Sequence, residues 1–240
     1  MDTAKDTEFY NEISATYSRD RYPVKARSYG QFFFKRRLAK ALEVLQEKIS
    51  DTERQYSLLE VGCADGIVIR TIYDRFAAHF SLLHGVDVSP KMIEAAKDNH
   101  AQTPITFAMR DSGEEKTSYD LVVEIGVINY TDVAEEIERA YAATKDNGYY
   151  IASYAATDSL WHALKPGNKG FNNLLPYSAF EALARKYFTI EKAIPIGFFI
   201  PFLWKFSALA APIQAVIESL CSRILPNLAH EKIYLLRKII

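Results

Sequence analysis

Residues 56–66 read YSLLEVGCADG, in which an apolar strand ends in a turn of small residues. Glycine at positions 62 and 66, with alanine between them, lets the backbone turn tightly and pass close to a ligand, because no large side chain intervenes. A helix is expected directly afterwards, over residues 67–80, since its apolar residues recur on one face. This strand–turn–helix unit sets the pattern for the residues that follow it.

Strand and helix alternate from residue 56 to residue 194. Further strands are expected over residues 82–88, 105–108, 119–125, 149–154, 188–194 and 232–237. Short strands that are apolar on both sides, separated by amphipathic helices, predict an α/β fold with a mostly parallel sheet and helices on both faces. Ligands bind such sheets beyond the carboxyl ends of the strands, so the candidate functional residues are the ones at those ends.

The chain is expected to have four parts. Residues 1–50 are aromatic and basic and predict a helical cap, in which Pro23 separates two helices and the second begins near Lys25. Residues 51–195 form the α/β core, residues 196–230 an apolar helical insertion, and residues 231–240 the final core strand.

Composition excludes several classes of protein. Of the 240 residues, 49% are hydrophobic and 25% are charged, which is typical of a globular protein and excludes disorder or a fibre. With 29 basic and 30 acidic residues, the net charge of -1 lacks the excess of positive charge that nucleic-acid binding requires. Two cysteines and scattered histidines predict no disulfide framework and no metal site. With no apolar signal segment at the start, we expect a cytoplasmic protein.

Acidic and small residues stand at successive strand ends. Asp87 lies about 20 residues after the glycine turn, where a carboxylate can hold the two hydroxyls of a ribose. Asp111 follows the third strand and can accept a hydrogen bond from an adenine amino group. After the fourth strand, the main chain at 124–126 and the ring of Tyr130 can face a cation. A dinucleotide fingerprint needs glycine at its sixth position, where Ile67 stands, so a nicotinamide cofactor is disfavoured.

Taken together, these motifs resemble the class I S-adenosylmethionine-dependent methyltransferases of the small-molecule type. The resemblance is carried by residues 58–66, 85–92, 110–111, 119–127 and 147–150, in that order. It implies a Rossmann-like seven-stranded sheet whose last strand, 232–238, lies antiparallel between the fifth and sixth. The chain departs from the family at Ala64, where many members have glycine, and at Asn129, where relatives often carry glutamate.

The resemblance also implies a cofactor, S-adenosylmethionine, with S-adenosylhomocysteine as product. Glu60 and the turn at 62–66 would hold its methionine part, Asp87 its ribose and Asp111 its adenine, so that three carboxylates converge on one adenosyl group. Met92 would pack near the adenine, and the N-terminal tyrosines would fold over the cofactor. The expected cofactor-binding residues are Glu60, Gly62, Cys63, Ala64, Gly66, Asp87, Val88, Met92, Arg110, Asp111, Ser112, Glu124, Ile125, Gly126, Tyr130, Tyr17 and Tyr22.

The acceptor is expected to be a small, partly apolar molecule that receives the methyl group on oxygen, nitrogen or carbon. Candidate bases lie just past the fifth strand: Tyr154, Asp158 and His162. His162 is the best of them because an imidazole titrates near neutral pH. Proton transfer to water is the alternative to a protein base.

An apolar stretch precedes the last strand. Between residues 193 and 217 the only charged residue is Lys205. Prolines at 195, 201 and 212 argue against one straight membrane-spanning helix. Residues 194–228 are open to three interpretations: a lid on the acceptor pocket, a dimer face or a foot on a membrane surface. Two other functions stay open, namely a catalytically silent subunit of the same fold that binds a partner through 194–228, and a nicotinamide-dependent dehydrogenase.

Overall fold

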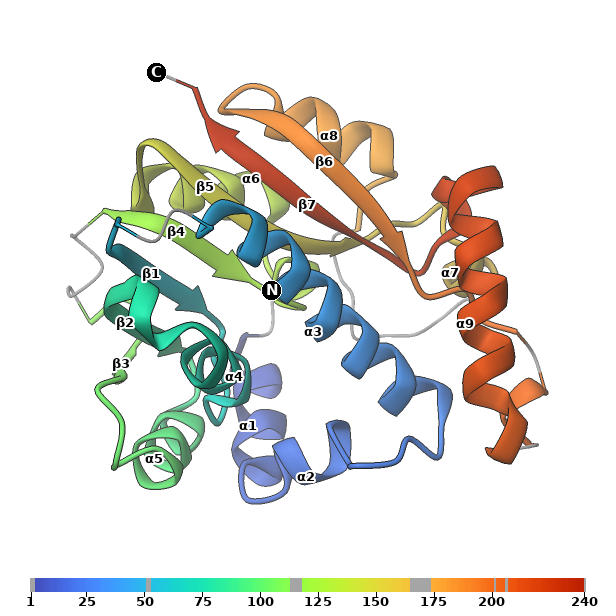
Figure 1. Cartoon of the computed structure of the whole chain (residues 1–240), viewed down its shortest axis with the longest axis horizontal. Helices are drawn as coiled ribbons and strands as arrows, with labels where there is room; N and C mark the ends of the chain where they lie inside the picture. The colour runs from blue at the N-terminus through green and yellow to red at the C-terminus, as the bar shows by residue number, and fades with distance from the viewer. Residues whose placement is uncertain are drawn as a thin grey trace.

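The computed structural model describes residues 3–50, 53–112, 118–164, 174–200, 202–205 and 207–239. One sheet organises the chain, with strands in the order β3-β2-β1-β4-β5-β7-β6 (Figure 1). Strands β1 to β5 pair in parallel, and β7 is antiparallel to both of its neighbours. This confirms the predicted sheet and the place of its last strand. The strands are β1 (Tyr56–Val61), β2 (Phe80–Asp87), β3 (Thr106–Met109), β4 (Tyr119–Glu124), β5 (Thr144–Ala155), β6 (Phe188–Ile196) and β7 (Glu231–Lys238).

Helices cover both faces of the sheet. The α-helices of the described residues are α1 (Thr3–Ile13), α2 (Tyr17–Arg21), α3 (Tyr29–Lys48), α4 (Ile67–Phe76), α5 (Pro90–Asn99), α6 (Val133–Ala143), α7 (Leu160–Leu164), α8 (Tyr177–Ala184) and α9 (Ser207–Ile224). Helices α3, α4 and α5 pack into one hydrophobic core, and α6 and α8 into the other. Consecutive residues of β1 supply both cores, Leu58 the first and Leu59 the second, as expected of a strand that is buried on two sides.

The N-terminal segment differs from the prediction. Three helices precede β1 instead of two, because the chain already breaks at residues 14–16, before Pro23. Helix α3 begins at Tyr29 and not near Lys25, since the Ser28 hydroxyl accepts a hydrogen bond from the backbone N–H of Gln31 (3.3 Å) and caps the helix there. Helices α1 and α2 lie at the end of the sheet toward which β1 and β4 point (Figure 1).

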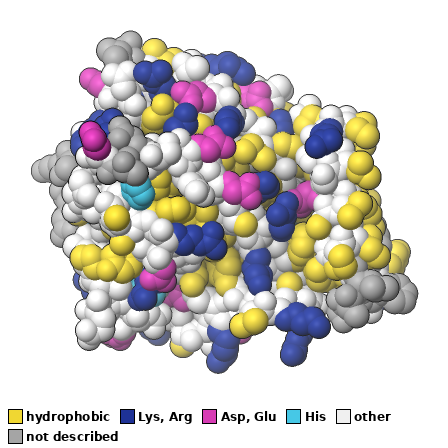
Figure 2. Space-filling view, viewed as in Figure 1, with side chains coloured by type: hydrophobic (Ala, Val, Ile, Leu, Met, Phe, Trp, Pro, Cys, Tyr) yellow, Lys and Arg dark blue, Asp and Glu magenta, His cyan; other side chains and the backbone are white. Residues whose placement is uncertain are grey.

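The apolar insertion is helical, as predicted, and leaves one face exposed. An ion pair of 2.8 Å between Glu218 of α9 and Arg36 of α3 holds α9 against the cap. Its outer face carries Ile213, Val216, Leu220 and Ile224, which are 41–73% exposed. Figure 2 shows hydrophobic side chains gathered on the side where α9 lies. Within the part of the chain that the structure describes, no helix is both long and apolar enough to cross a membrane.

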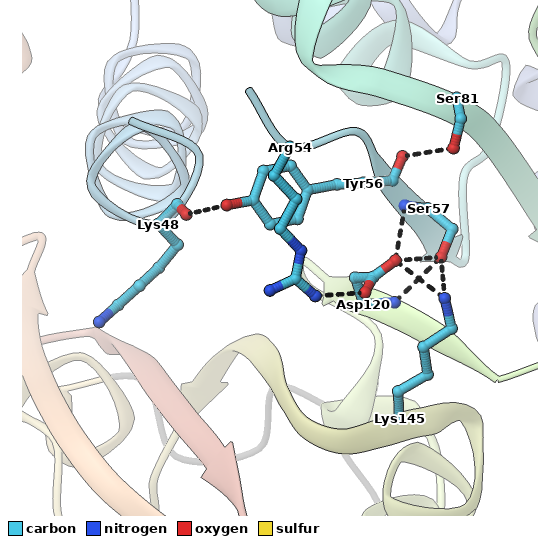
Figure 3. A network of polar contacts seen from close by, with 7 residues as sticks. All are labelled: Lys48, Arg54, Tyr56, Ser57, Ser81, Asp120 and Lys145. Atoms are coloured by element: carbon cyan, nitrogen blue, oxygen red, sulfur yellow. Dashed lines mark hydrogen bonds and ion pairs between the residues drawn. The ribbon is translucent and has the colours of Figure 1, made fainter. Parts of the chain in front are cut away.

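A network of polar contacts joins β1, β4 and β5 at the end of the sheet away from α1 and α2 (Figure 3). The Asp120 carboxylate accepts hydrogen bonds from the backbone N–H (2.9 Å) and hydroxyl (2.7 Å) of Ser57. It also pairs with Lys145 at 2.9 Å and Arg54 at 2.8 Å. Partial burial acts in the opposite direction, but these donors hold the pKa of Asp120 well below its usual value.

This network gives a prediction for Asp120→Asn. The variant should lose about 1.5–3 kcal/mol of unfolding free energy at pH 7, since hydrogen bonds to a charged acceptor are lost. The folded-state pKa lies below the unfolded value of roughly 3.9, so this stabilisation is complete above about pH 5 and is lost as the pH falls further. Urea unfolding at pH 7 and pH 3 measures it: the difference in unfolding free energy between the two proteins should be clearly smaller at pH 3 than at pH 7. The control is Asp74→Asn, whose exposed pairing with Arg70 is worth less than about 0.5 kcal/mol.

Candidate active site

The glycine turn after β1 is tightly packed. Gly62 has a φ of 68°, and a Cβ there would lie 2.2 Å from Cγ2 of Val127. Its backbone N–H and that of Cys63 donate to the carbonyl of Val86, at 2.7 and 3.0 Å. Only glycine satisfies both the backbone conformation and the contact, so the turn holds β1, β2 and the end of β4 in one arrangement.

Glu60, the acidic residue of β1, binds the first turn of a helix. Its carboxylate accepts a hydrogen bond of 2.9 Å from the backbone N–H of Ile69 in the first turn of α4. The side chain is buried, and burial raises the pKa of this carboxyl well above its ordinary value. Glu60 therefore orients α4 behind the turn and faces neither cavity described below.

Asp87, at the end of β2, is held by two backbone donors. Its oxygens accept hydrogen bonds of 2.9 Å from the N–H groups of Ala64 and Ser89. The residue is 8% exposed; burial raises its carboxyl pKa, whereas these hydrogen bonds act to lower it. A carboxylate has about four acceptor positions, so each oxygen of Asp87 can accept one more hydrogen bond from a ligand.

A first cavity of about 130 Å³ opens beside Asp87. Tyrosines dominate one wall: the Tyr10 ring lies 6.4 Å from that of Tyr17 and 6.1 Å from that of Tyr130. The other wall is formed by the strand ends. The cavity is lined by Thr7, Tyr10, Tyr17, Gly62, Ala64, Asp87, Val88, Arg110, Ile125, Gly126, Val127, Tyr130 and Thr131.

Two contacts fasten the N-terminal helices over this cavity. The Ser18 backbone N–H and hydroxyl both donate to the carboxylate of Asp65 in the glycine turn, at 3.1 and 2.5 Å. The Ser89 hydroxyl, which caps α5, donates to the side-chain oxygen of Asn11 at 2.7 Å. Helices α1 and α2 therefore form a wall of the site that is tied to the same strand ends as Asp87.

The structure brings together nine of the residues expected to bind a cofactor. Those that line the first cavity are Gly62, Ala64, Asp87, Val88, Arg110, Ile125, Gly126, Tyr130 and Tyr17. The others lie outside its lining: Glu60, Cys63, Gly66, Met92, Asp111, Ser112, Glu124 and Tyr22.

The three carboxylates expected to converge do not share a cavity. Asp87 lines the first cavity, and Glu60 is turned toward α4. Asp111 is exposed, adopts a φ of 63°, and lines a different cavity with Arg110 and Glu136. Glu124 is also turned away, because its carboxylate accepts a hydrogen bond of 2.5 Å from Tyr150. The contact of Asp111 with adenine stays a prediction.

A second cavity, of about 190 Å³, adjoins the first. Gly126 and Tyr130 line both cavities, so the two cavities are direct neighbours. The second cavity is lined by Arg21, Tyr29, Gly30, Phe33, Phe34, Arg37, Gly126, Asn129, Tyr130, Trp161, His230 and Glu231. Among the described residues of 196–228, none lines either cavity. Phe199 packs against the rings of Tyr29 and Trp161, so this part of the insertion supports the wall of the second cavity.

The predicted bases lie outside both cavities. His162 is half-buried on α7, and Asp158 is exposed and accepts from the backbone N–H of Tyr177. The Tyr154 hydroxyl is bound to the backbone of Leu175, and burial raises its pKa to about 12, which makes it a poor base. The imidazole that lines the second cavity belongs to His230, whose Nδ1 lies 3.4 Å from the Tyr29 hydroxyl.

Sequence reasoning missed His230 although a signal was present. The last strand was expected to run antiparallel, so the residues at its start lie at the edge where the parallel strands end. The register confirms this, since Glu231 pairs with Ala155 at the end of β5. His230 and Glu231 are therefore strand-end residues of the same edge as Asp87. Among the described residues, no group of histidine, cysteine and carboxylate side chains is arranged to hold a metal ion.

Comparison with known proteins finds methyltransferases. A family model described as a methyltransferase domain matches residues 59–150. Malonyl-[acyl-carrier protein] O-methyltransferase 1 of Ilyobacter polytropus is 26% identical over 144 residues, which cover 59% of this chain and 52% of that protein. The hybrid PKS-NRPS synthetase apdA of Emericella nidulans is 29% identical over 125 residues, only 3% of its length. The chain thus spans about half of the first of these relatives.

Solved structures share the whole fold. Magnesium protoporphyrin IX methyltransferase from Synechocystis, crystallised with S-adenosylhomocysteine, superposes with a TM-score of 0.67 at 14% identity, over 99% of this chain and 100% of that one. The N-methyltransferase NodS from Bradyrhizobium japonicum, with the same ligand, gives 0.65 at 15% identity over 100% of both chains. At these identities the likeness establishes the class I methyltransferase fold.

Proposed function

We propose that this chain, which contains an S-adenosylmethionine-dependent methyltransferase domain of class I, transfers a methyl group from that cofactor to a small, partly apolar molecule. One observation carries the proposal. The first cavity combines a carboxylate at the end of β2 with three tyrosine rings, and it shares Gly126 and Tyr130 with a second cavity that is lined by aromatic and charged side chains. A methyl donor and an acceptor need two adjoining sites of this kind.

The residues of the first cavity suit the cofactor. Asp87 keeps acceptor positions for two ribose hydroxyls while the backbone of Ala64 and Ser89 fixes its orientation. The rings of Tyr10, Tyr17 and Tyr130 suit a flat adenine and a sulfonium cation, because the face of an aromatic ring attracts positive charge. Helices α1 and α2, which are tied to Asp65 and Ser89, exclude water from this side.

When bound, S-adenosylmethionine supplies an activated methyl group: an acceptor lone pair forms the new bond to carbon, and the electrons of the broken C–S bond remain on sulfur. The protein has to align the acceptor with that methyl group. Gly126 and Tyr130 stand where the two cavities meet, so we assign them this positioning role. His230 is the ionisable imidazole on the acceptor side, and it replaces His162 as our candidate to take a proton.

Malonyl-[acyl-carrier protein] O-methyltransferases, to which the chain is similar, are named for methyl transfer to oxygen. This supports oxygen as the acceptor atom here.

Two measurements test the proposed function. Titration calorimetry should show saturable binding of S-adenosylhomocysteine and none of NADH. Methyl-labelled S-adenosylmethionine, incubated with the protein and a small-molecule extract, should yield labelled small molecules. Binding of S-adenosylhomocysteine without any transfer would favour the catalytically silent subunit, and preference for NADH would favour the dehydrogenase.

A further inference from the structure

We propose that the acceptor carries a carboxylate on a flat body of about one ring, and that it binds in the second cavity with this carboxylate at Arg21 and Arg37. The inference rests on the proposed function, because it names the substrate class of the second cavity. It is carried by the charges and rings that line that cavity.

Arg21 is a cation held in place by aromatic rings. Its guanidinium carbon lies 4.3 Å from the ring centre of Tyr17 and 4.9 Å from that of Phe34. One of its N–H groups donates to the Tyr17 hydroxyl at 3.2 Å. Within the described part of the chain, no carboxylate forms an ion pair with Arg21. A guanidinium has five N–H donors in one plane, so Arg21 retains donors for a planar anion.

Arg37 supplies a second donor to the same cavity. Its Nη1 pairs with Glu231 at 3.1 Å, and both side chains are buried, at 6% and 4% exposure. The Nε of Arg37 is also buried and has no hydrogen-bond acceptor among the described residues. An unsatisfied buried donor on a charged group is costly, so the surroundings of Arg37 favour an anion over a neutral ligand in the cavity that it lines.

The ion pair of Arg37 with Glu231 leaves Arg21 as a net positive charge in the lining. Arg21 and Arg37 contribute two positive charges and Glu231 one negative charge, and the two guanidinium groups repel each other. One carboxylate neutralises the excess. A cationic acceptor would increase the repulsion, and a doubly charged phosphate monoester would leave an unpaired negative charge in a largely apolar site.

The rings of the cavity favour a flat molecule. The His230 ring stacks on those of Phe33 and Trp161, with ring centres 4.3 and 4.6 Å apart and planes 24° and 21° from parallel. Tyr29 stacks on Trp161 as well. Aromatic side chains that line a cavity pack well against a flat, apolar body. A cavity of about 190 Å³ has room for far more than a single water molecule, so a ligand of one ring and its substituent can enter it.

Benzoate, benzamide and phenyl phosphate are matched probes for this inference. Their binding is measured by the quenching of tryptophan fluorescence, because Trp161 lines the cavity, with Trp161→Phe to identify the signal. We expect benzoate to bind at least tenfold more tightly than either of the other probes. Arg21→Met should weaken benzoate binding at least tenfold, and Arg21→Lys should weaken it less because it keeps the charge but loses the planar fork. Arg19→Met is the control, since Arg19 lies on the same helix and is 75% exposed.

Binding of S-adenosylhomocysteine is measured on every variant, which separates the two claims and reports folding. Equal binding of benzoate and benzamide by protein that binds S-adenosylhomocysteine overturns the carboxylate inference and leaves the methyltransferase proposal standing. Tighter binding of phenyl phosphate than of benzoate overturns the inference in favour of a phosphorylated acceptor. Loss of benzoate binding in Arg19→Met as large as in Arg21→Met overturns the assignment to Arg21. Selective benzoate binding without any binding of S-adenosylhomocysteine would support the acidic-ligand site and contradict the proposed function.

Discussion

Replacing Asp87 by alanine is expected to lower the affinity for S-adenosylhomocysteine by roughly ten- to hundredfold. Hydrogen bonds to a charged group contribute about 1.5–3 kcal/mol, and each 1.4 kcal/mol corresponds to a factor of about ten. The side chain of Asp87, at the end of β2, lines the first cavity, and two backbone N–H groups hold its carboxylate in position. Titration calorimetry measures the effect directly.

A control separates loss of the ligand contact from damage to the turn. Asp87→Asn should retain one of the two backbone hydrogen bonds and still lose most of the affinity, because its charge is gone. Asp98→Ala, at an exposed position of α5, should leave the affinity unchanged. Wild-type affinity in both Asp87 variants would remove Asp87 from the cofactor site.

Glu231→Gln is expected to lower the unfolding free energy by about 3–5 kcal/mol, the range observed when one partner of a buried ion pair is removed. The substitution leaves the guanidinium of Arg37 charged, because an arginine side chain keeps its proton in a protein. It also removes Glu231, which in the wild type offsets the lowering of the Arg37 pKa by burial. The guanidinium of Arg37 also packs closely against Gly126, just after the end of β4. Urea unfolding at pH 7 measures the loss.

The double variant Arg37→Met with Glu231→Gln distinguishes an unpaired charge from lost packing. It should recover at least half of the lost stability, because neither buried charge remains. Lys40→Met breaks a partly exposed pair with Glu43 on the same helix and should cost less than about 1 kcal/mol. A double variant no more stable than Glu231→Gln alone would show that packing, and not charge, explains the effect.

The core of the fold was predictable because its local patterns agree with its tertiary structure. The strands between 56 and 155 are largely apolar runs, except that β5 begins five residues earlier than predicted, with the polar residues 144–147. The pairing of such runs into a covered parallel sheet follows from their spacing. Ser89 and Pro90 begin α5 as their positions suggest, with the Ser89 hydroxyl accepting from Met92. The strand ends could therefore be identified, and with them Asp87 and Gly126.

The directions of the side chains at the strand ends could not be predicted from the sequence. Glu60 and Asp87 both end buried strands, but Glu60 meets the first turn of α4 while Asp87 faces the cavity. Asp111 points elsewhere because its backbone is left-handed, a conformation that the residue type permits but does not require. The N-terminal cap was predicted as helical, yet its break at residues 14–16 depends on contacts such as that of Ser18 with Asp65.

The second cavity depends on long-range placement. Arg37 and Glu231 are separated by 194 residues and meet only because β7 returns to the sheet beside β5. His230 joins the same cavity for this reason. The strand ends, taken in chain order, identify residues of the first cavity. The residues of the second cavity that lie at the start of β7 can be identified only when the position of this antiparallel strand is known.

A crystal structure of the protein with S-adenosylhomocysteine tests the central claim most directly. The account predicts that the nucleoside occupies the first cavity, with both ribose hydroxyls within hydrogen-bonding distance of Asp87, the sulfur facing Gly126 and Tyr130, and the second cavity open beside the sulfur. Ligand density outside this cavity, or a ribose that makes no contact with Asp87, would contradict it.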